Sequence, residues 1–168
     1  MELGNFEIDL SVNYVDAFFF AVSLKFPNFP IPNFPIPMTI FSRIIAGEIP
    51  SYKIAENEKF FAFLDIFPLV KGHVLVVPKI ETDKFFDVPD NYLSELLVFA
   101  KPIAHAIERS FPCNRCGVSV VGLEVPHAHL HLIPINSADD LNFNRPKLKL
   151  SAEELKEVQE KILVELED

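Results

Sequence analysis

Cysteine is scarce in this sequence, and its scarcity excludes one class of metal site. Cys113 and Cys116 are the only two cysteines, in the order Cys-Asn-Arg-Cys. A four-cysteine zinc site needs a second such pair, and the chain has none. We therefore expect two reduced thiols without a metal between them.

An excess of positive charge is also absent. The chain has 15 Lys and Arg against 24 Asp and Glu, so its formal net charge is −9 and its pI is near 5.0. Nucleic acids and anionic membrane surfaces attract clustered Lys and Arg, so neither is expected as the main partner. A small phosphate ligand is not excluded, because it responds to the local charge of a cleft.

Long apolar runs are missing as well. The run Ala17–Val22 near the start is far shorter than the roughly 20 residues of a membrane span. No basic segment precedes it and no small-residue cleavage site follows it, so a signal peptide is not expected. We predict a cytoplasmic protein without a membrane partner.

The chain divides into two parts of different composition. Residues 1–37 hold seven of the 17 phenylalanines and five of the 14 prolines, and Asn28–Pro32 repeats as Asn33–Pro37. Dense proline favours an extended, polyproline-like chain, and the alternation over Phe6–Tyr14 is that of a half-buried strand. We predict that residues 1–37 are a Phe/Pro-rich extension outside the core, with Met38 as the functional start, and that residues 38–168 form one domain. The alternative is an arm that packs on a partner subunit.

The second part predicts an α+β domain. Short strands joined by turns favour a mainly antiparallel sheet of about five strands, with a long helix over about 89–110 and a C-terminal helix after the capping box Ser151–Glu154. Thr39 and Gly47 bound a short first helix, and Pro102 predicts a kink or break in the long one. The predicted strands are 52–55, 60–65, 73–78, 117–121 and 129–133.

The segment after Pro126 carries the chemical signal. His127, His129 and His131 alternate with Ala128, Leu130 and Leu132. Side chains of a strand alternate between its two faces, so we expect three imidazoles in a row on one face and an apolar opposite face. Imidazole titrates near pH 6.5 and can act as nucleophile, acid, base or donor at neutral pH.

This arrangement suits phosphate chemistry. A ring nitrogen can attack phosphorus to form a covalent phosphohistidine, while its neighbours hold oxygens and donate to the leaving group. No cofactor is needed for that scheme. A catalytic zinc ion held by the same three histidines is the alternative from another class, although no nearby Asp or Cys completes the set.

Several segments together resemble the histidine triad (HIT) family. His127–Ile133 matches its triad, Ile40–Pro50 resembles its opening helix, and Ala62–Pro68 and Gly72–Lys79 resemble its two central strands, in order, from about residue 39 to 135. The resemblance implies the HIT-like fold, usually a homodimer. It also implies a hydrolase or transferase acting on phosphoramidates or dinucleoside polyphosphates of purine nucleotides, through a nucleotidyl-histidine.

The resemblance also implies roles for residues. His129 would be the nucleophile, flanked by His127 and His131, with His73 as a fourth imidazole. Asp65 would bind the ribose hydroxyls. Four residues would enclose the base, although each could equally be ordinary core: Phe41, Ile44, Phe63 and Ile66.

The chain departs from the family just before the triad. Many HIT hydrolases have Gly-Gln-(Ser/Thr)-Val there, and this chain has Gly122-Leu123-Glu124-Val125. Leucine donates no hydrogen bond, and Glu124 brings a negative charge near a phosphate. We therefore expect Glu124 to favour a positively charged leaving group. A nucleotide-binding module with little turnover is the alternative. The cysteine pair that binds zinc near the start of some relatives is also absent from Thr39–Ser42.

Overall fold

The computed structural model describes residues 38–167. The predictions about the extension 1–37, including its strand and the start at Met38, lie outside the described residues. The elements in chain order are α2 (Ile40–Ile45), β1 (Lys53–Glu56), β2 (Phe60–Leu64), β3 (Val74–Pro78), α3 (Asp90–Ser110), β4 (Arg115–Ser119), β5 (Leu130–Ile135) and α4 (Ala152–Glu167). Short 3-10 helices occupy Phe85–Asp87 and Ala138–Leu141.

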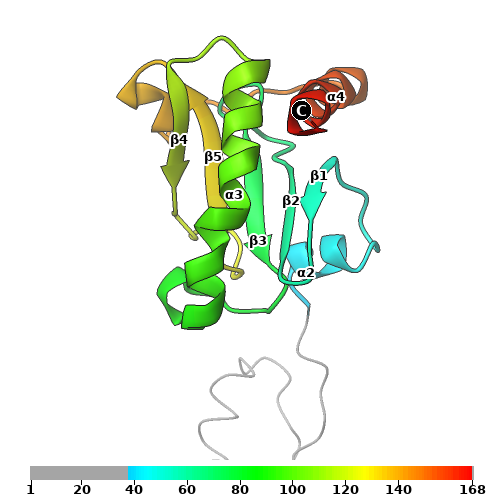
Figure 1. The fold of residues 1–168 in the computed structure, drawn as a ribbon, viewed down its shortest axis with the longest axis vertical. Helices are drawn as coiled ribbons and strands as arrows, with labels where there is room; N and C mark the ends of the chain where they lie inside the picture. Colours follow the sequence, from blue (N-terminus) through cyan, green and yellow to red (C-terminus); the bar gives the residue numbers. More distant parts are fainter. Residues whose placement is uncertain (1–37, 168) are drawn as a thin grey trace, which may run out of the picture. The chain divides into compact units, whose positions relative to one another are not determined.

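The five strands form one antiparallel sheet in the order β1-β2-β3-β5-β4 (Figure 1). Helix α3 contacts β3, β4 and β5, and α4 contacts β1 and α3, so the two long helices cover one face. The predicted α+β fold is therefore confirmed. Within residues 38–167, no helix combines the length and the apolar character that crossing a bilayer requires.

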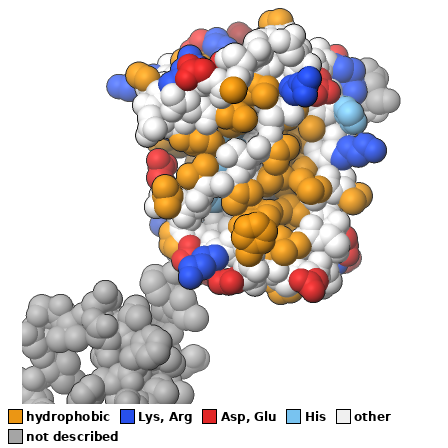
Figure 2. All heavy atoms as spheres, turned by 90° about the vertical axis from the view of Figure 1, so that its left-hand side faces the viewer, with side chains coloured by type: hydrophobic (Ala, Val, Ile, Leu, Met, Phe, Trp, Pro, Cys, Tyr) orange, Lys and Arg blue, Asp and Glu red, His pale blue; other side chains and the backbone are white. Residues whose placement is uncertain are grey.

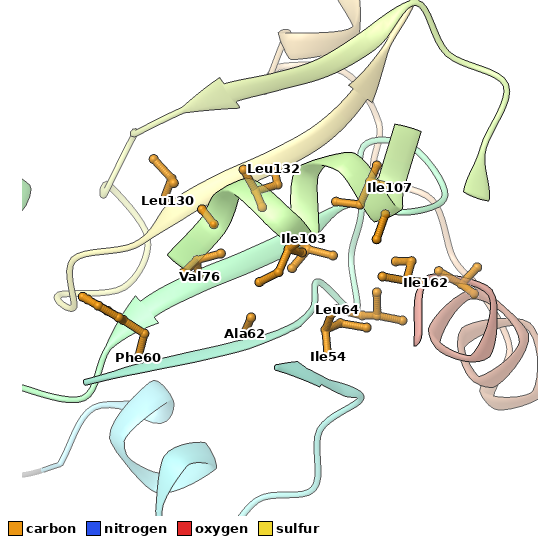
Figure 3. Packing of buried hydrophobic residues seen from close by; sticks show 14 of the residues in the cluster. Ile54, Phe60, Ala62, Leu64, Val76, Ile103, Ile107, Leu130, Leu132 and Ile162 are labelled. Atoms are coloured by element: carbon orange, nitrogen blue, oxygen red, sulfur yellow. The ribbon is translucent and has the colours of Figure 1, made fainter. Parts of the chain in front are cut away.

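Strict alternation along the central strands gives the sheet two apolar faces. Phe60, Ala62 and Leu64 of β2 point into the main core beneath α3 and α4, which also receives Leu130 and Leu132 of β5 (Figure 3). Phe61 and Phe63 of β2 belong to a second buried cluster on the opposite face, with α2. Burying each such side chain contributes about 1.5–3 kcal/mol, so both faces stabilise the sheet.

The helix ends follow the predicted signals. The Thr39 hydroxyl accepts from the Ser42 N–H at the start of α2, and Gly47 ends that helix region with a φ of 77°. The predicted capping box at α4 is formed, because Ser151 and Glu154 exchange side-chain-to-backbone bonds of 3.0 and 3.2 Å. Pro102 was predicted to kink or break the long helix; α3 runs unbroken through it, so there is no break, and the kink stays a prediction.

The strand bounds differ most around the triad. The strand predicted over 129–133 is Leu130–Ile135, and the one predicted over 117–121 is Arg115–Ser119. His127 and His129 therefore precede β5 instead of lying in its ladder. The reason is a contact remote in sequence: the Ala128 N–H donates to the Thr82 carbonyl at 2.6 Å instead of to a neighbouring strand.

Candidate active site

The imidazoles lie on the face of the sheet opposite the long helices. His131 of β5 pairs in register with Leu75 of β3, a member of the second cluster, and its chain neighbours Leu130 and Leu132 point into the main core. The rings of His129 and His131 are 4.8 Å apart between centroids. The Phe41 ring of α2 lies 5.2 Å from that of His129 and 5.9 Å from that of His127. The predicted row of three rings is thus present, although only His131 lies in a hydrogen-bonded strand.

The hydrogen bond of His129 determines which nitrogen is free to react. Its Nδ1 lies 2.7 Å from the His127 carbonyl oxygen, which can only accept, so Nδ1 carries the proton. The neutral ring then has its lone pair on Nε2, which makes no hydrogen bond to residues 38–167. Nε2 of His129 is therefore the nucleophilic atom of this ring.

His73 and His131 form a hydrogen-bonded pair with a defined direction. The Leu69 N–H donates to Nδ1 of His73 at 3.3 Å, so the His73 proton is on Nε2. That Nε2–H donates to Nδ1 of His131 at 2.9 Å, which leaves the proton of His131 on Nε2. His131 Nε2 is buried and has no partner among the described residues. A buried, unpaired donor costs free energy unless a ligand accepts from it.

Burial keeps both members of this pair neutral. Desolvation, with a contribution from the charge of Lys147, lowers the pKa of His73 to about 3. Desolvation, with a smaller contribution from the neighbouring His73, lowers the pKa of His131 to about 3. At neutral pH the pair therefore offers N–H donors without a positive charge.

His127 has both ring nitrogens engaged within the protein. Its Nε2–H donates to the Pro78 carbonyl at 2.8 Å, so Nδ1 accepts, and the Thr39 hydroxyl lies 2.8 Å from that atom. The Thr39 N–H in turn donates to the Glu81 carboxylate at 2.6 Å. Burial, the largest cause, lowers the pKa of His127. This histidine joins the start of α2 to the triad segment.

Asp65 stands directly after β2, beside His73. Its Oδ1 accepts from the Phe67 N–H at 2.8 Å, which forms a turn, and its Oδ2 lies 3.4 Å from Nδ1 of His73. Desolvation raises the pKa of this carboxyl group. The turn bond is therefore formed, and the ribose role of Asp65 stays a prediction.

Three of the four residues predicted to enclose the base gather in one apolar cluster. Phe41 and Phe63 are buried, with ring centroids 5.5 Å apart, and Ile44 packs against their cluster. Ile66 is 52% exposed and outside that cluster. β2 ends at Leu64, and Ile66 lies in the turn closed by the bond from the Phe67 N–H to Asp65.

The segment that departs from the family pattern faces solvent. Leu123 is 88% exposed and Glu124 is exposed, whereas Val125 packs against the second cluster. Gly122 adopts a φ of 67°, which an L side chain rarely adopts. A cavity of about 280 Å³ lies beside this segment, lined by Val120–Gly122, Asp83–Phe86, Ala128 and His129.

One group of side chains could hold a metal ion. In residues 38–167, ligand atoms of Asp65, His73 and His131 lie within 4.8 Å of one another. This set differs from the three triad histidines weighed from sequence, because His127 has both nitrogens in hydrogen bonds and His129 is not a member. A metal bound to His131 through Nδ1 would have to replace its 2.9 Å bond to His73.

Two contacts of the site were missed from sequence. Phe143 places its ring 4.8 Å from that of His131, and Lys147 places its Nζ 4.9 Å from the centre of the Phe143 ring. The segment after β5 has no periodic pattern that would predict these contacts. Thr39 was identified as a helix cap, but its second bond, to His127, spans 88 residues.

Comparisons with known proteins agree with this geometry. The sequence pattern of the HIT domain matches residues 46–138. A HIT-like protein of Borreliella burgdorferi is 37% identical over 127 residues, which cover 71% of this chain and 91% of that protein. The adenosine 5'-monophosphoramidase HNT1 of Candida albicans is 36% identical over 138 residues, which cover 76% and 90%.

A solved structure shows the same fold. The zinc-bound histidine triad family protein of Mycobacterium smegmatis superimposes with a TM-score of 0.64 at 27% identity, over 76% of this chain and 92% of its own length. The match of the family pattern to more than half of the chain, together with the relatives and this fold, establishes that the protein belongs to the HIT, or histidine triad, family.

Proposed function

We propose that this protein is a nucleotide hydrolase or transferase that cleaves a phosphoramidate or phosphoanhydride bond at the α-phosphate of a purine nucleotide. The observation that carries the proposal is the pairing of two ring atoms. Nε2 of His129 offers a lone pair, and the adjacent ring of His131 offers an unpaired Nε2–H. A nucleophile beside a preorganised donor is what attack on a phosphate requires.

The reaction would proceed in two displacements. His129 Nε2 bonds to the α-phosphorus while the bond from phosphorus to the leaving nitrogen or oxygen breaks, and the leaving group takes up a proton from the solvent side. The positive charge on the nucleotidyl-imidazole is stabilised by the bond from Nδ1–H to the His127 carbonyl. Water then attacks phosphorus, breaks the bond to Nε2 and releases the nucleoside monophosphate with loss of a proton.

The surroundings support a nucleotide as the substrate. The His131 Nε2–H would donate to a phosphate oxygen, Asp65 would accept from ribose hydroxyls, and the slot of Phe41, Ile44 and Phe63 would hold a purine. The Candida albicans relative is an adenosine 5'-monophosphoramidase, which supports an adenosine phosphoramidate as the first substrate to test. Dinucleoside polyphosphates are the second.

The experiment is incubation with adenosine 5'-phosphoramidate, with measurement of released AMP and capture of the nucleotidyl-protein by mass spectrometry. We expect AMP and an adduct on His129, neither of them in His129→Ala. His105→Ala is the control, because this exposed histidine lies on α3 away from the triad. Nucleotide binding without AMP release would favour the binding module. Activity lost with a chelator and restored by zinc would favour metal chemistry.

We also propose a homodimer, with β4 as the contact strand. β4 is an edge of the sheet, and no strand among residues 38–167 pairs with its outer side. Hydrophobic side chains gather on the face that includes this edge (Figure 2), where Val118, Val120 and Val121 are exposed by 37–50%. Open edges with exposed apolar residues pair readily with a second copy. Light scattering of the wild type and of Val118→Lys tests this association.

A further inference from the structure

The segment after the 3-10 helix Ala138–Leu141 returns along the active site and is held there. The Leu148 N–H donates to the Pro68 carbonyl at 2.8 Å, in the loop that follows Asp65. Arg145 pairs with Asp140 at 3.2 Å and with Asp139 at 3.5 Å. These bonds at both ends fix the intervening residues against the site. The segment lies beyond the 46–138 match to the family.

Phe143 forms a wall of the histidine pair. Its ring stands edge-on to His131 at 4.8 Å and to His73 at 6.5 Å between centroids. The ring is half-buried, so it shields the pair from solvent on that side. A cation held against Phe143 is therefore held next to His131.

Lys147 is that cation. Its Nζ lies 4.9 Å from the centre of the Phe143 ring, within cation–π range. Lys59, Lys71 and Lys79 each have a carboxylate partner within 4 Å, whereas no carboxylate of residues 38–167 lies that close to Lys147. The side chain is half-buried, so it is held near the site with its charge unpaired.

The charges around the His73–His131 pair indicate the role of the Lys147 ammonium group. His73 and His131 are neutral, so they cannot balance the charge of a phosphate. Of the lysines and arginines in residues 38–167, Lys147 alone contributes to the pKa of His73, His131 and Asp65. Lys147 is therefore the positive charge that would act on an anion bound at the unpaired Nε2–H of His131.

We propose that Lys147 binds the phosphate group of the nucleotide as an ammonium donor to a non-bridging oxygen, and that Phe143 positions it. This inference rests on the proposed function for the identity of the ligand. It adds a binding residue from a segment outside the family match. The chemistry is that of a charge-assisted hydrogen bond to phosphate, in which the ammonium acts as a compact point charge.

The test compares binding of AMP and of adenosine, which differ only in the phosphate group. Calorimetric titrations are made with the wild type, Lys147→Met, Lys147→Arg and the control Lys149→Met, which removes the same charge from an exposed side chain two residues away. We expect Lys147→Met to weaken AMP binding roughly 10- to 100-fold, as for loss of a hydrogen bond to a charged group. Adenosine binding should change less than about twofold.

The other variants sharpen the result. Lys147→Arg should recover most of the AMP affinity, and Lys149→Met should bind AMP as the wild type does. If Lys147→Met proves unstable, Lys147→Gln removes the charge with a polar side chain and gives the same comparison. AMP binding by the wild type should also fall more steeply with salt than binding by the uncharged variant.

Two outcomes overturn the inference on Lys147. One is unchanged AMP affinity in Lys147→Met, and the other is equal weakening of AMP and adenosine, which would mean that the lysine stem only packs. A wild type that binds AMP but releases none from the phosphoramidate would reject the proposed enzyme and leave the Lys147 result standing. A wild type that binds neither ligand overturns both proposals.

Discussion

The Nε2–H of His73 donates to Nδ1 of His131 across 2.9 Å, and this bond determines which nitrogen of His131 carries its proton. The direction of this bond follows from the Leu69 N–H, which donates to Nδ1 of His73 and so leaves the His73 proton on Nε2. Although His73 precedes His131 by 58 residues, it sets the tautomer that presents Nε2–H to the site. We therefore regard His73 as a positioning residue that acts through His131.

Replacing His73 tests this relationship directly. His73→Leu removes the donor, so His131 loses its fixed tautomer, and we expect kcat/KM to fall about 10- to 100-fold, as for loss of a buried hydrogen-bond partner worth 1–3 kcal/mol. His73→Gln should recover part of the activity, because its amide can donate from nearly the same place.

Nitrogen NMR of the His131 ring provides the readout that a packing defect would not move. The wild type should show the Nε2–H tautomer, and His73→Leu a mixture of tautomers. A single unchanged tautomer in His73→Leu would contradict the assigned role, whatever the loss of activity.

Thr39 joins the first helix to the triad segment. Its hydroxyl accepts from the Ser42 N–H and lies 2.8 Å from Nδ1 of His127. Thr39→Val keeps the shape and removes both bonds, so we expect a loss of about 1–2 kcal/mol in the free energy of unfolding. Urea denaturation measures it.

Thr39→Ser is the matched control, since it keeps the hydroxyl and should unfold within about 0.5 kcal/mol of the wild type. If the valine and serine variants had the same denaturation midpoint, the hydroxyl would contribute nothing and the link between α2 and His127 would be only a contact.

Periodicity explains how much of this fold could be read from sequence. Apolar runs bounded by turn residues predicted the central strands, and the capping pair Ser151 and Glu154 predicted the start of α4, because each signal is local. Alternation in the segment after Pro126 predicted that His129 and His131 share a face. It could not predict that the ladder begins at Leu130, since that depends on the Ala128 bond to Thr82.

From sequence, the site could be predicted only where its residues lie close together in the chain or follow a periodic pattern. Tautomers depend on partners remote in sequence, such as His73 for His131 and Pro78 for His127. Ile66 was expected in the base slot from the family resemblance alone, and its exposure depends on the turn after β2, which that resemblance does not predict. Phe143 and Lys147 come from an aperiodic segment, and only the folded chain brings them to His131.

The neutral histidine pair should make stability depend on pH. Burial lowers the folded-state pKa of His73 and His131 to about 3, against about 6.5 in the unfolded chain. Below pH 6.5 the unfolded state therefore binds more protons, so stability is full above that pH and is lost as the pH falls toward 3. Each ring contributes a slope of up to about 1.4 kcal/mol per pH unit.

Urea denaturation at pH 7.5, 6.0 and 5.0 checks this dependence. His131→Asn should show a shallower loss of stability than the wild type over this range, while His105→Asn, changed at an exposed position, should keep the wild-type slope. The groups near the pair are Asp65, His129 and Lys147, and all three are retained in both variants. Equal slopes for the two variants would mean that His131 is not held neutral.

Glu124 stands exposed, next to Val125, which packs against the cluster predicted to enclose the base. Its carboxylate would repel an anionic leaving group and attract a cationic amine, in water-accessible surroundings where such interactions amount to roughly 0.2–1 kcal/mol. The quantity to compare is kcat/KM for a phosphoramidate with a charged amine, divided by kcat/KM for a dinucleoside polyphosphate. We expect Glu124→Gln to lower this ratio by about two- to fivefold. Glu58→Gln, which removes the same charge in the β1–β2 turn, should leave the ratio unchanged. Both variants lose one negative charge, but only Glu124→Gln loses it beside the cluster predicted to enclose the base. The same ratio in the two variants would therefore show that the Glu124 carboxylate does not select the leaving group.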